Sequence, residues 1–349
     1  MRKILTILLA LLLCAGIGGA GYALYKTYSP DADKPVVENP VETPDDGDSN
    51  SGTQTPTENT LTAPENESSI VESRMEMQKG ASVYLSGADT TTGTLRFMVK
   101  AETAFVEQVQ ADENKKIYMA VAPVRYFDEV NTENKTYMDW ATAFAENESP
   151  VELVEITSFS TLDETYSYAY FRLESIPFGG MNMRIAAIAI LADESGETPV
   201  YKYSKMPEGE TYRTNARSLA YVVGAALNAH ALGETTYDEE SLVKLNSYVN
   251  MAVDYRNGLT ESTDDNSKPM LTFTKGTKAN VKAGETYAIE YQMTPAKVDM
   301  PVRFVSADTT IATVDANGTI TAVKEGTTTI KVCIAGVISN VNVTVTANA

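Results

Sequence analysis

Short runs of β-branched and aromatic residues make up residues 269–349, and their spacing constrains the fold more than any other feature. Glycine turns such as Asn317-Gly318 separate the runs, and glycine supplies the positive φ that a tight hairpin needs. Val341, Val343 and Val345 alternate with polar residues, as in a strand with one buried face. Seven short strands at this spacing predict a β-sandwich. The runs are 270–274, 287–293, 302–305, 311–314, 319–323, 328–334 and 339–346.

Four of these runs carry a resemblance to a known family. They read VRFVS at 302–306, IATVD at 311–315, NGTITAV at 317–323 and GTTTIKV at 326–332. With these motifs, residues 269–349 resemble the bacterial Ig-like domain, group 2, although Phe304 stands where the family commonly has a tryptophan. The resemblance implies an extracellular β-sandwich that serves as a spacer or adhesive module. It implies no catalytic residues.

Residues 70–260 form a larger, mainly β region. Its β-branched and aromatic runs predict an elaborated β-sandwich-like middle domain. Two helices are predicted to follow, at about 214–232 with Thr214 or Asn215 as the cap, and at about 238–256. Their short connection predicts that they pack antiparallel and close one side of the sandwich. The predicted strands are 81–85, 95–101, 117–124, 151–159, 166–173, 183–191 and 200–203.

Short stretches of this region carry a second resemblance. GASVYL at 80–85 and RSLAYV at 217–222 resemble segments of an uncharacterised surface-protein domain of Gram-positive, gut-type bacteria, over residues 75–225. The resemblance implies a location on the cell surface and brings no activity with it.

The N-terminal residues 1–28 predict export. Residues 4–24 are apolar and uncharged and follow two positive residues, so they suit a transmembrane anchor with the N-terminus inside. A cleaved signal peptide with its apolar core at 4–13 fits the same residues, and lipoprotein processing at Cys14 is a third interpretation. All three predict an extracellular or cell-surface protein, which contacts the membrane through residues 4–24 if they are not cleaved.

An acidic segment, residues 29–69, follows. It contains six of the fourteen prolines and ten acidic residues against one lysine, so it carries −9 of the formal charge of −19. Such a composition cannot bury enough apolar surface to fold, and it predicts a disordered linker or stalk. The acidic balance of the whole chain also excludes nucleic acid as a partner, because binding to phosphates needs clustered lysine and arginine.

The scarcity of cysteine and histidine limits the chemistry. Cys14 and Cys333 are too few for a disulfide framework, and with His230 they do not complete a zinc site. His230 is interpreted as a packing residue and Cys333 as a small buried one. No metal or cofactor is predicted, since no spaced loop of oxygen ligands surrounds the acidic residues that could suggest calcium. Those residues are Asp264, Asp265 and Asp315.

Tyrosines provide the candidate binding residues of the middle domain. Tyr166, Tyr168 and Tyr170 alternate along one predicted strand and therefore project from one face of its sheet. Tyr201 and Tyr203 repeat the pattern. Flat rings with polar edges suit stacking on sugars, while packing under the helices or cross-strand pairing is the alternative.

Three functions fit these features. The preferred one is a non-enzymatic cell-surface protein whose middle domain binds a glycan or a protein ligand. A secreted glycan-active enzyme is the second, because glycosidases need only two suitably spaced carboxylates. A purely structural envelope spacer is the third.

Overall fold

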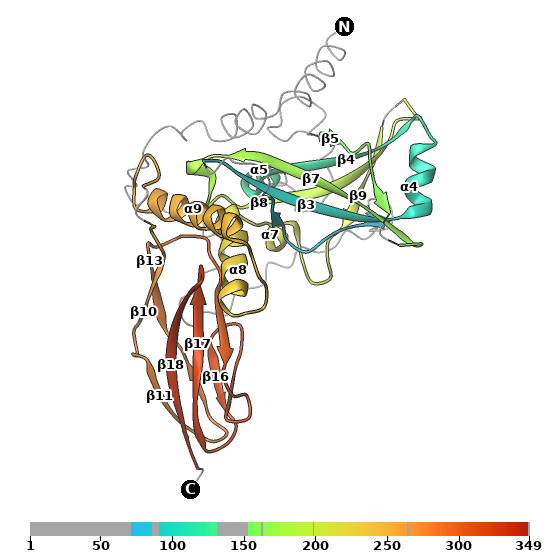
Figure 1. Ribbon diagram of the computed structural model, residues 1–349. Coiled ribbons are helices and arrows are strands. Elements are labelled where there is room, and N and C mark those ends of the chain that lie inside the picture. Colours follow the sequence, from blue (N-terminus) through green and yellow to red (C-terminus); the bar gives the residue numbers. More distant parts are fainter. Residues whose placement is uncertain are drawn as a thin grey trace.

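A computed structural model describes residues 71–85, 91–130, 153–161, 163–197, 199–263 and 266–347. They form a sheet domain, residues 71–263, and a C-terminal module, residues 266–347, and two helices of the sheet domain lie between the sheet and the module (Figure 1). The predicted export segment, 1–28, and the predicted stalk, 29–69, lie outside the described residues. No helix in the described part is both long and apolar enough to span a bilayer.

The nine strands of the sheet domain form one continuous sheet. Their order is β5-β4-β8-β9-β1-β3-β7-β6, with β2 beside β3. Neighbouring strands are antiparallel, except β1 and β9, which are parallel. The strands are β1 (Val71–Met77), β2 (Ser82–Val83), β3 (Gly93–Glu102), β4 (Lys115–Pro123), β5 (Leu153–Glu155), β6 (Ser160–Thr161), β7 (Tyr166–Ile176), β8 (Ile185–Asp193) and β9 (Val200–Lys205).

Alternation along the strands sets the two faces of the sheet. In β3 the buried Leu95, Phe97 and Val99 alternate with the half-buried Arg96 and Met98. In β8 nearly every side chain is buried, because α5 (Val124–Val130) and α7 (Tyr212–Asn215) cover its second face. The outer face of β3 and β7 is therefore more open than that of β8.

The curvature of the sheet corrects the predicted sandwich in one respect. Three strands separate β3 from β4, yet α4 (Thr103–Gln110) packs against both of them and against β7. Phe97 of β3 and Met119 of β4 belong to the same core. Two halves of one curved sheet therefore enclose the core, in place of two separate sheets. The parallel pairing of β1 with β9 joins the halves, and the alternation of single strands does not encode such a pairing.

The two helices that close the sheet domain are α8 (Leu219–Ala231) and α9 (Glu239–Arg256). Ser218 caps α8, so this helix begins later than the predicted Thr214 or Asn215. Asn215 is used differently, because its Oδ1 accepts a hydrogen bond from the Gly80 N–H at 2.6 Å. Asp238 caps α9. The single turn η2 (Phe178–Gly180) packs against α9.

The C-terminal module has three sheets around its own core. Their orders are β11-β18-β17-β14, β12-β16-β15 and β10-β13, and β11 runs parallel to β18. Val341, Val343 and Val345 of β18 point into this core, as their alternation predicts. The strands are β10 (Met270–Phe273), β11 (Lys278–Lys282), β12 (Thr286–Ala288), β13 (Tyr291–Thr294), β14 (Val302–Ser306), β15 (Ala312–Val314), β16 (Thr319–Ala322), β17 (Gly326–Ile334) and β18 (Val337–Thr346).

One turn of the module explains a sequence motif. Gly318 has a φ of 81°, and a Cβ there would lie 2.9 Å from the ring of Phe304. Asp315 Oδ1 accepts hydrogen bonds from the N–H groups of Asn317 and Thr319 at 2.9 and 2.8 Å. Glycine is needed at 318 both for its backbone angle and for the close approach of this ring.

The junction between the two bodies is a shared core. Leu227 of α8 and Ile334 of β17 belong to the same buried cluster. A Cβ on Gly224 would lie 3.2 to 3.3 Å from atoms of Met300 and Pro301, so glycine permits the close approach of the module to α8. The sheet domain and the module are thus packed against each other, with α8 as the common element.

Asn228 provides the polar contacts of this junction. Its side chain is fully buried. Its Nδ2 donates to the Pro301 carbonyl at 2.8 Å, and its Oδ1 accepts from the Gly336 N–H at 3.1 Å and from Cys333 Sγ at 3.2 Å. One side chain of the sheet domain thus satisfies backbone groups from two separate segments of the module.

Asp254 of α9 holds the connection between the two bodies. Its side chain is buried, and its Oδ2 accepts from the N–H and the Oγ1 of Thr263 at 2.7 and 2.9 Å. Its Oδ1 accepts from Ser267 Oγ at 2.6 Å. Asn250, one helical turn earlier, also bonds to Thr263 and Ser267. The chain that leads into the module is therefore fixed to α9 at both of these residues.

We expect the stability of the junction to depend on pH through Asp299. Burial raises the pKa of its carboxyl group, and the nearby Arg184 opposes this only in part. A raised pKa favours folding while the group is protonated, and this contribution is lost as the pH rises through the raised pKa. We expect Asp299→Asn, which imitates the protonated state, to stabilise the protein at pH 7 by on the order of 1 kcal/mol or less. The gain should vanish near pH 4. Thermal unfolding at both pH values checks this, and a loss of stability at pH 7 would contradict it.

Candidate functional site

The tyrosine face consists of Tyr166, Tyr168 and Tyr170 on the outer side of β7. Ser167 and Ala169, between them, point the other way and are buried. Tyr170 is 44% exposed, and Tyr166 and Tyr168 are half-buried. These three predicted residues thus share one partly open face of the sheet. Tyr166 pairs with the last residue of β3, directly before α4, and Figure 1 shows α4 at the end of the sheet domain far from the module.

The rings of the tyrosine face contact each other and two cations of β3. Tyr168 and Tyr170 meet edge to face, with ring centroids 5.1 Å apart. Lys100 Nζ lies 4.6 Å from the ring centroid of Tyr166, and Arg96 Cζ lies 4.4 Å from that of Tyr170. Cation–π contacts of this kind hold a ring in place without covering it on both sides. The tyrosine face is therefore an ordered aromatic surface.

Cations beside the tyrosines were not among the residues predicted from the sequence. Arg96 Nε donates to Ser82 Oγ at 3.0 Å, and Arg172 Cζ lies 4.0 Å from the ring centroid of Tyr84. The signal was present in the sequence, because Arg96 and Lys100 fall on the polar side of the alternation in β3. That alternation does not say which strand lies beside β3, so it could not connect them to the tyrosines.

Tyr201 and Tyr203 do not join this surface. Tyr203 is only 2% exposed and lies in the second core, opposite Ile190 of β8. Tyr201 is half-buried, and burial together with the nearby Glu194 raises its pKa. The prediction of Tyr203 as a ligand-binding residue is wrong, because Phe127 of α5 and Tyr212 of α7 belong to the same buried core as Tyr203. Tyrosines alternate in the same way in β7 and β9. The two strands differ in that helices pack over the tyrosine side of β9, whereas the tyrosines of β7 are partly exposed.

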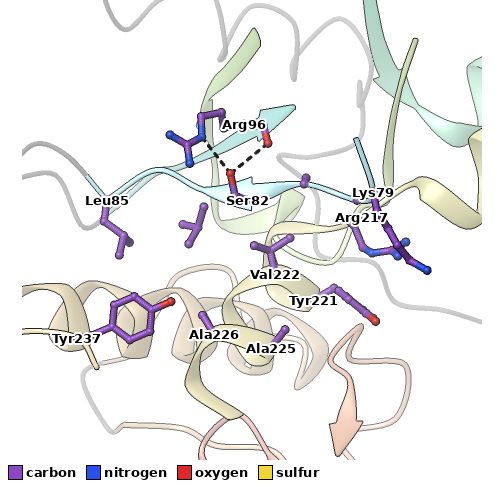
Figure 2. A pocket seen from close by; sticks show the side chains of 13 residues that line it. Lys79, Ser82, Leu85, Arg96, Arg217, Tyr221, Val222, Ala225, Ala226 and Tyr237 are labelled. Carbon is purple, nitrogen blue, oxygen red and sulfur yellow. Dashed lines mark hydrogen bonds between the residues drawn. The ribbon is translucent and has the colours of Figure 1, made fainter. Parts of the chain in front are cut away.

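A cleft of about 380 Å³ lies between β2 and α8. Figure 2 shows Lys79 and Arg217 together at one end, with Tyr237 at the other. Arg217 Cζ lies 4.9 Å from the ring centroid of Tyr221. Arg96, which lies beside the tyrosine face, also lines the cleft. No aspartate or glutamate is among the described residues that line it. The other lining residues are Gly80, Ala81, Ser82, Val83, Leu85, Val222, Ala225 and Ala226.

The other groups considered from the sequence are a cysteine, a histidine and three aspartates. Cys333 is fully buried at the junction, and burial raises the pKa of its thiol. His230 is half-buried, and its ring centroid lies 6.1 Å from that of Tyr237. Within the described ranges, no three His, Cys, Asp or Glu side chains are grouped as metal ligands. Asp315 caps a turn, and Asp264 and Asp265 lie outside the described residues.

Solved structures similar to this chain include surface-layer and immunoglobulin-type proteins. Domains 4 and 5 of the S-layer protein SbsC share 16% identity with it, with 46% of this chain and 66% of that chain covered and a TM-score of 0.20. Domains 1–6 of the surface layer protein SbsC share 13% identity, with 80% and 29% covered and a TM-score of 0.21. A three-domain titin fragment, I67–I69, shares 9% identity, with 79% and 66% covered and a TM-score of 0.17. The chain thus spans less than two thirds of each of these chains.

No curated protein matches the chain. A family model described as the bacterial Ig-like domain (group 2) matches residues 270–345. These residues include the nine described strands of the C-terminal module, apart from the last residue of β18, and the four motifs between 302 and 332. The C-terminal module of this chain is a bacterial Ig-like domain of group 2.

Proposed function

We propose that the chain is a non-enzymatic cell-surface protein that binds a glycan through the tyrosine face. The Ig-like module then acts as a spacer or attachment unit for the sheet domain. The observation that carries the proposal is the partial exposure of Tyr166, Tyr168 and Tyr170 on one uninterrupted strand. An extracellular location is supported by the Ig-like family and by the predicted export segment.

The chemistry of the tyrosine face suits sugars. Sugar rings present C–H groups that stack on aromatic rings, and tyrosine hydroxyls can bond to their hydroxyl groups. Two rings already fixed edge to face lose little side-chain entropy when a ligand binds. The three tyrosines are not among the residues that line the cleft, which favours a polymer that lies across the sheet over a small enclosed ligand.

Binding to a glycan array tests the proposal. We expect the double variant Tyr168→Ala, Tyr170→Ala to lose at least tenfold in affinity for the glycan that binds, because one stacked ring contributes about 1 kcal/mol. Tyr168→Phe keeps the ring and should lose less. The control is Tyr287→Ala in the module, which should leave the affinity unchanged. Tyr287 is also a half-buried tyrosine beside a cation, with Lys275 Nζ 5.7 Å from its ring centroid.

Two outcomes would count against glycan binding. One is a chain that binds no glycan on arrays or on purified wall polymers. The other is a double variant that binds as well as the wild type while it remains folded. In the second case the ligand lies elsewhere on the molecule.

A purely structural role is the second candidate, and the junction favours it. The two bodies share one core, and Asn228 and Asp254 fix their contact through buried hydrogen bonds. Such an arrangement keeps a constant angle between neighbouring bodies, which a spacer in an envelope layer needs. A folded chain that binds no glycan and no protein ligand would favour the structural role over glycan binding.

A further inference from the structure

Two arginines lie directly opposite each other on the outer face of the sheet domain. The register of β3 and β7 pairs Arg96 with Arg172, next to the pair of Met98 with Tyr170. Like charges directly opposite each other in antiparallel strands destabilise the sheet. The opposition of the two charges by itself therefore does not stabilise the sheet, and a role in binding explains why two arginines stand opposite each other.

The two arginines have no acidic ion-pair partner among the described residues. In the part of the chain that the structure describes, Arg96 and Arg172 form no ion pair, although the chain has 47 acidic residues against 28 basic ones. Lys100, on the same strand as Arg96, does approach a carboxylate, that of Glu76, at 3.9 Å. The two arginines thus form a local positive site on a strongly acidic protein.

Both guanidinium groups are positioned by aromatic rings. Arg96 lies over Tyr170 and donates to Ser82 through its Nε, and Arg172 lies over Tyr84. A guanidinium group stacked on a ring keeps N–H donors at its edge for a ligand. The register places the two residues opposite each other, and the forked donors of each guanidinium group suit carboxylates and similar oxyanions.

We propose that Arg96 and Arg172 bind the acidic group of an anionic sugar, a carboxylate or a sulfate ester, while the ring of Tyr170 stacks on the sugar. This inference rests on the proposed glycan-binding function and specifies its ligand class. Arg96 connects the proposed stacking ring with the second arginine. Its guanidinium group lies over the ring of Tyr170 on β7, and its partner in the strand register is Arg172. A neutral glycan would leave both charges without a partner and would be bound more weakly.

The test compares matched ligands by titration calorimetry on the whole chain. The probes are oligomers of galacturonic acid, the same oligomers as neutral methyl esters, and galactose oligomers with sulfate esters. We expect one or both acidic probes to bind at least tenfold more tightly than the methyl ester. Arg96→Gln and Arg172→Gln should each reduce this binding about tenfold, since a charge-assisted hydrogen bond is lost. The comparison of the two acidic probes identifies the acidic group.

Matched variants separate binding from folding. Lys116→Gln removes a positive charge from β4 of the same sheet, which three strands separate from β3, and it should leave the affinity unchanged. Each arginine variant loses a contact with a ring but relieves a like-charge contact, so we expect the melting temperature to fall by no more than about 2 °C. A larger drop would mean that the arginines stabilise the fold, and it would overturn the inference.

The remaining outcomes distinguish the two proposals. Equal affinity for the acidic and the methyl-ester probes, with binding lost in Tyr168→Ala, Tyr170→Ala, overturns the anionic ligand and leaves glycan binding in place. Binding to none of the probes nor to any array glycan overturns both. Binding of an acidic probe that needs the arginines but not the tyrosines supports the anion site and overturns stacking.

Discussion

Asn228→Ala is expected to destabilise the protein by about 3 kcal/mol and to separate the unfolding of its two bodies. The change leaves the Pro301 carbonyl and the Gly336 N–H buried without their partner, and it opens a cavity where a fully buried side chain was packed. Each unsatisfied buried group costs about 1 to 3 kcal/mol. Urea unfolding measures the free energy, and calorimetry shows whether one transition becomes two.

A neighbouring variant provides the control for this experiment. Cys333→Ala removes the thiol that donates to Asn228 Oδ1 but leaves both backbone contacts in place, so it should cost about 1 kcal/mol or less. A loss below about 1 kcal/mol in Asn228→Ala, with a single transition retained, would show that the apolar part of the junction is sufficient by itself.

Asp254→Ala is expected to free the connection between the two bodies and to cost about 3 kcal/mol. The buried carboxylate accepts hydrogen bonds from Thr263 and Ser267, and bonds to a charged acceptor contribute about 1.5 to 3 kcal/mol each, without adding fully. The Thr263 amide donates directly to Asp254, so its hydrogen exchange should become much faster. Exchange at this amide and urea unfolding together measure the effect.

Asp254→Asn is the matched variant, because it keeps the shape and one acceptor oxygen but removes the charge. We expect it to lose about half as much stability as Asp254→Ala and to retain part of the protection at Thr263. Unchanged exchange at Thr263 in Asp254→Ala would show instead that Asn250 holds the connection alone.

The sequence predicted the module more completely than the sheet domain. In the module, successive strands are joined by short turns, and motifs such as Asn317-Gly318 mark where they begin and end. In the sheet domain the short strand β1 and the helices α4 and α5 were not predicted. β1 pairs in parallel with β9, more than a hundred residues away, and no local pattern records such a partner.

The candidate site was predicted in part. Alternation placed Tyr166, Tyr168 and Tyr170 on one face of a strand, and the structure has them there. The same rule proposed Tyr203, which is buried in one core with Phe127 of α5 and Tyr212 of α7. Alternation says which residues share a face but not what covers that face, and it cannot place Arg96 opposite Arg172.

The parallel pairing of β11 with β18 has a mechanical consequence. The registered pairs run from Lys278 with Asn342 to Lys282 with Thr346, so the second strand of the module lies beside its last strand. β11 is reached from the junction, and the end of β18 points away from it (Figure 1). A pull between the sheet domain and the C-terminal end therefore loads this row of hydrogen bonds in shear, all at once. The pairing places the resistance to tension at the point where the chain leaves the module.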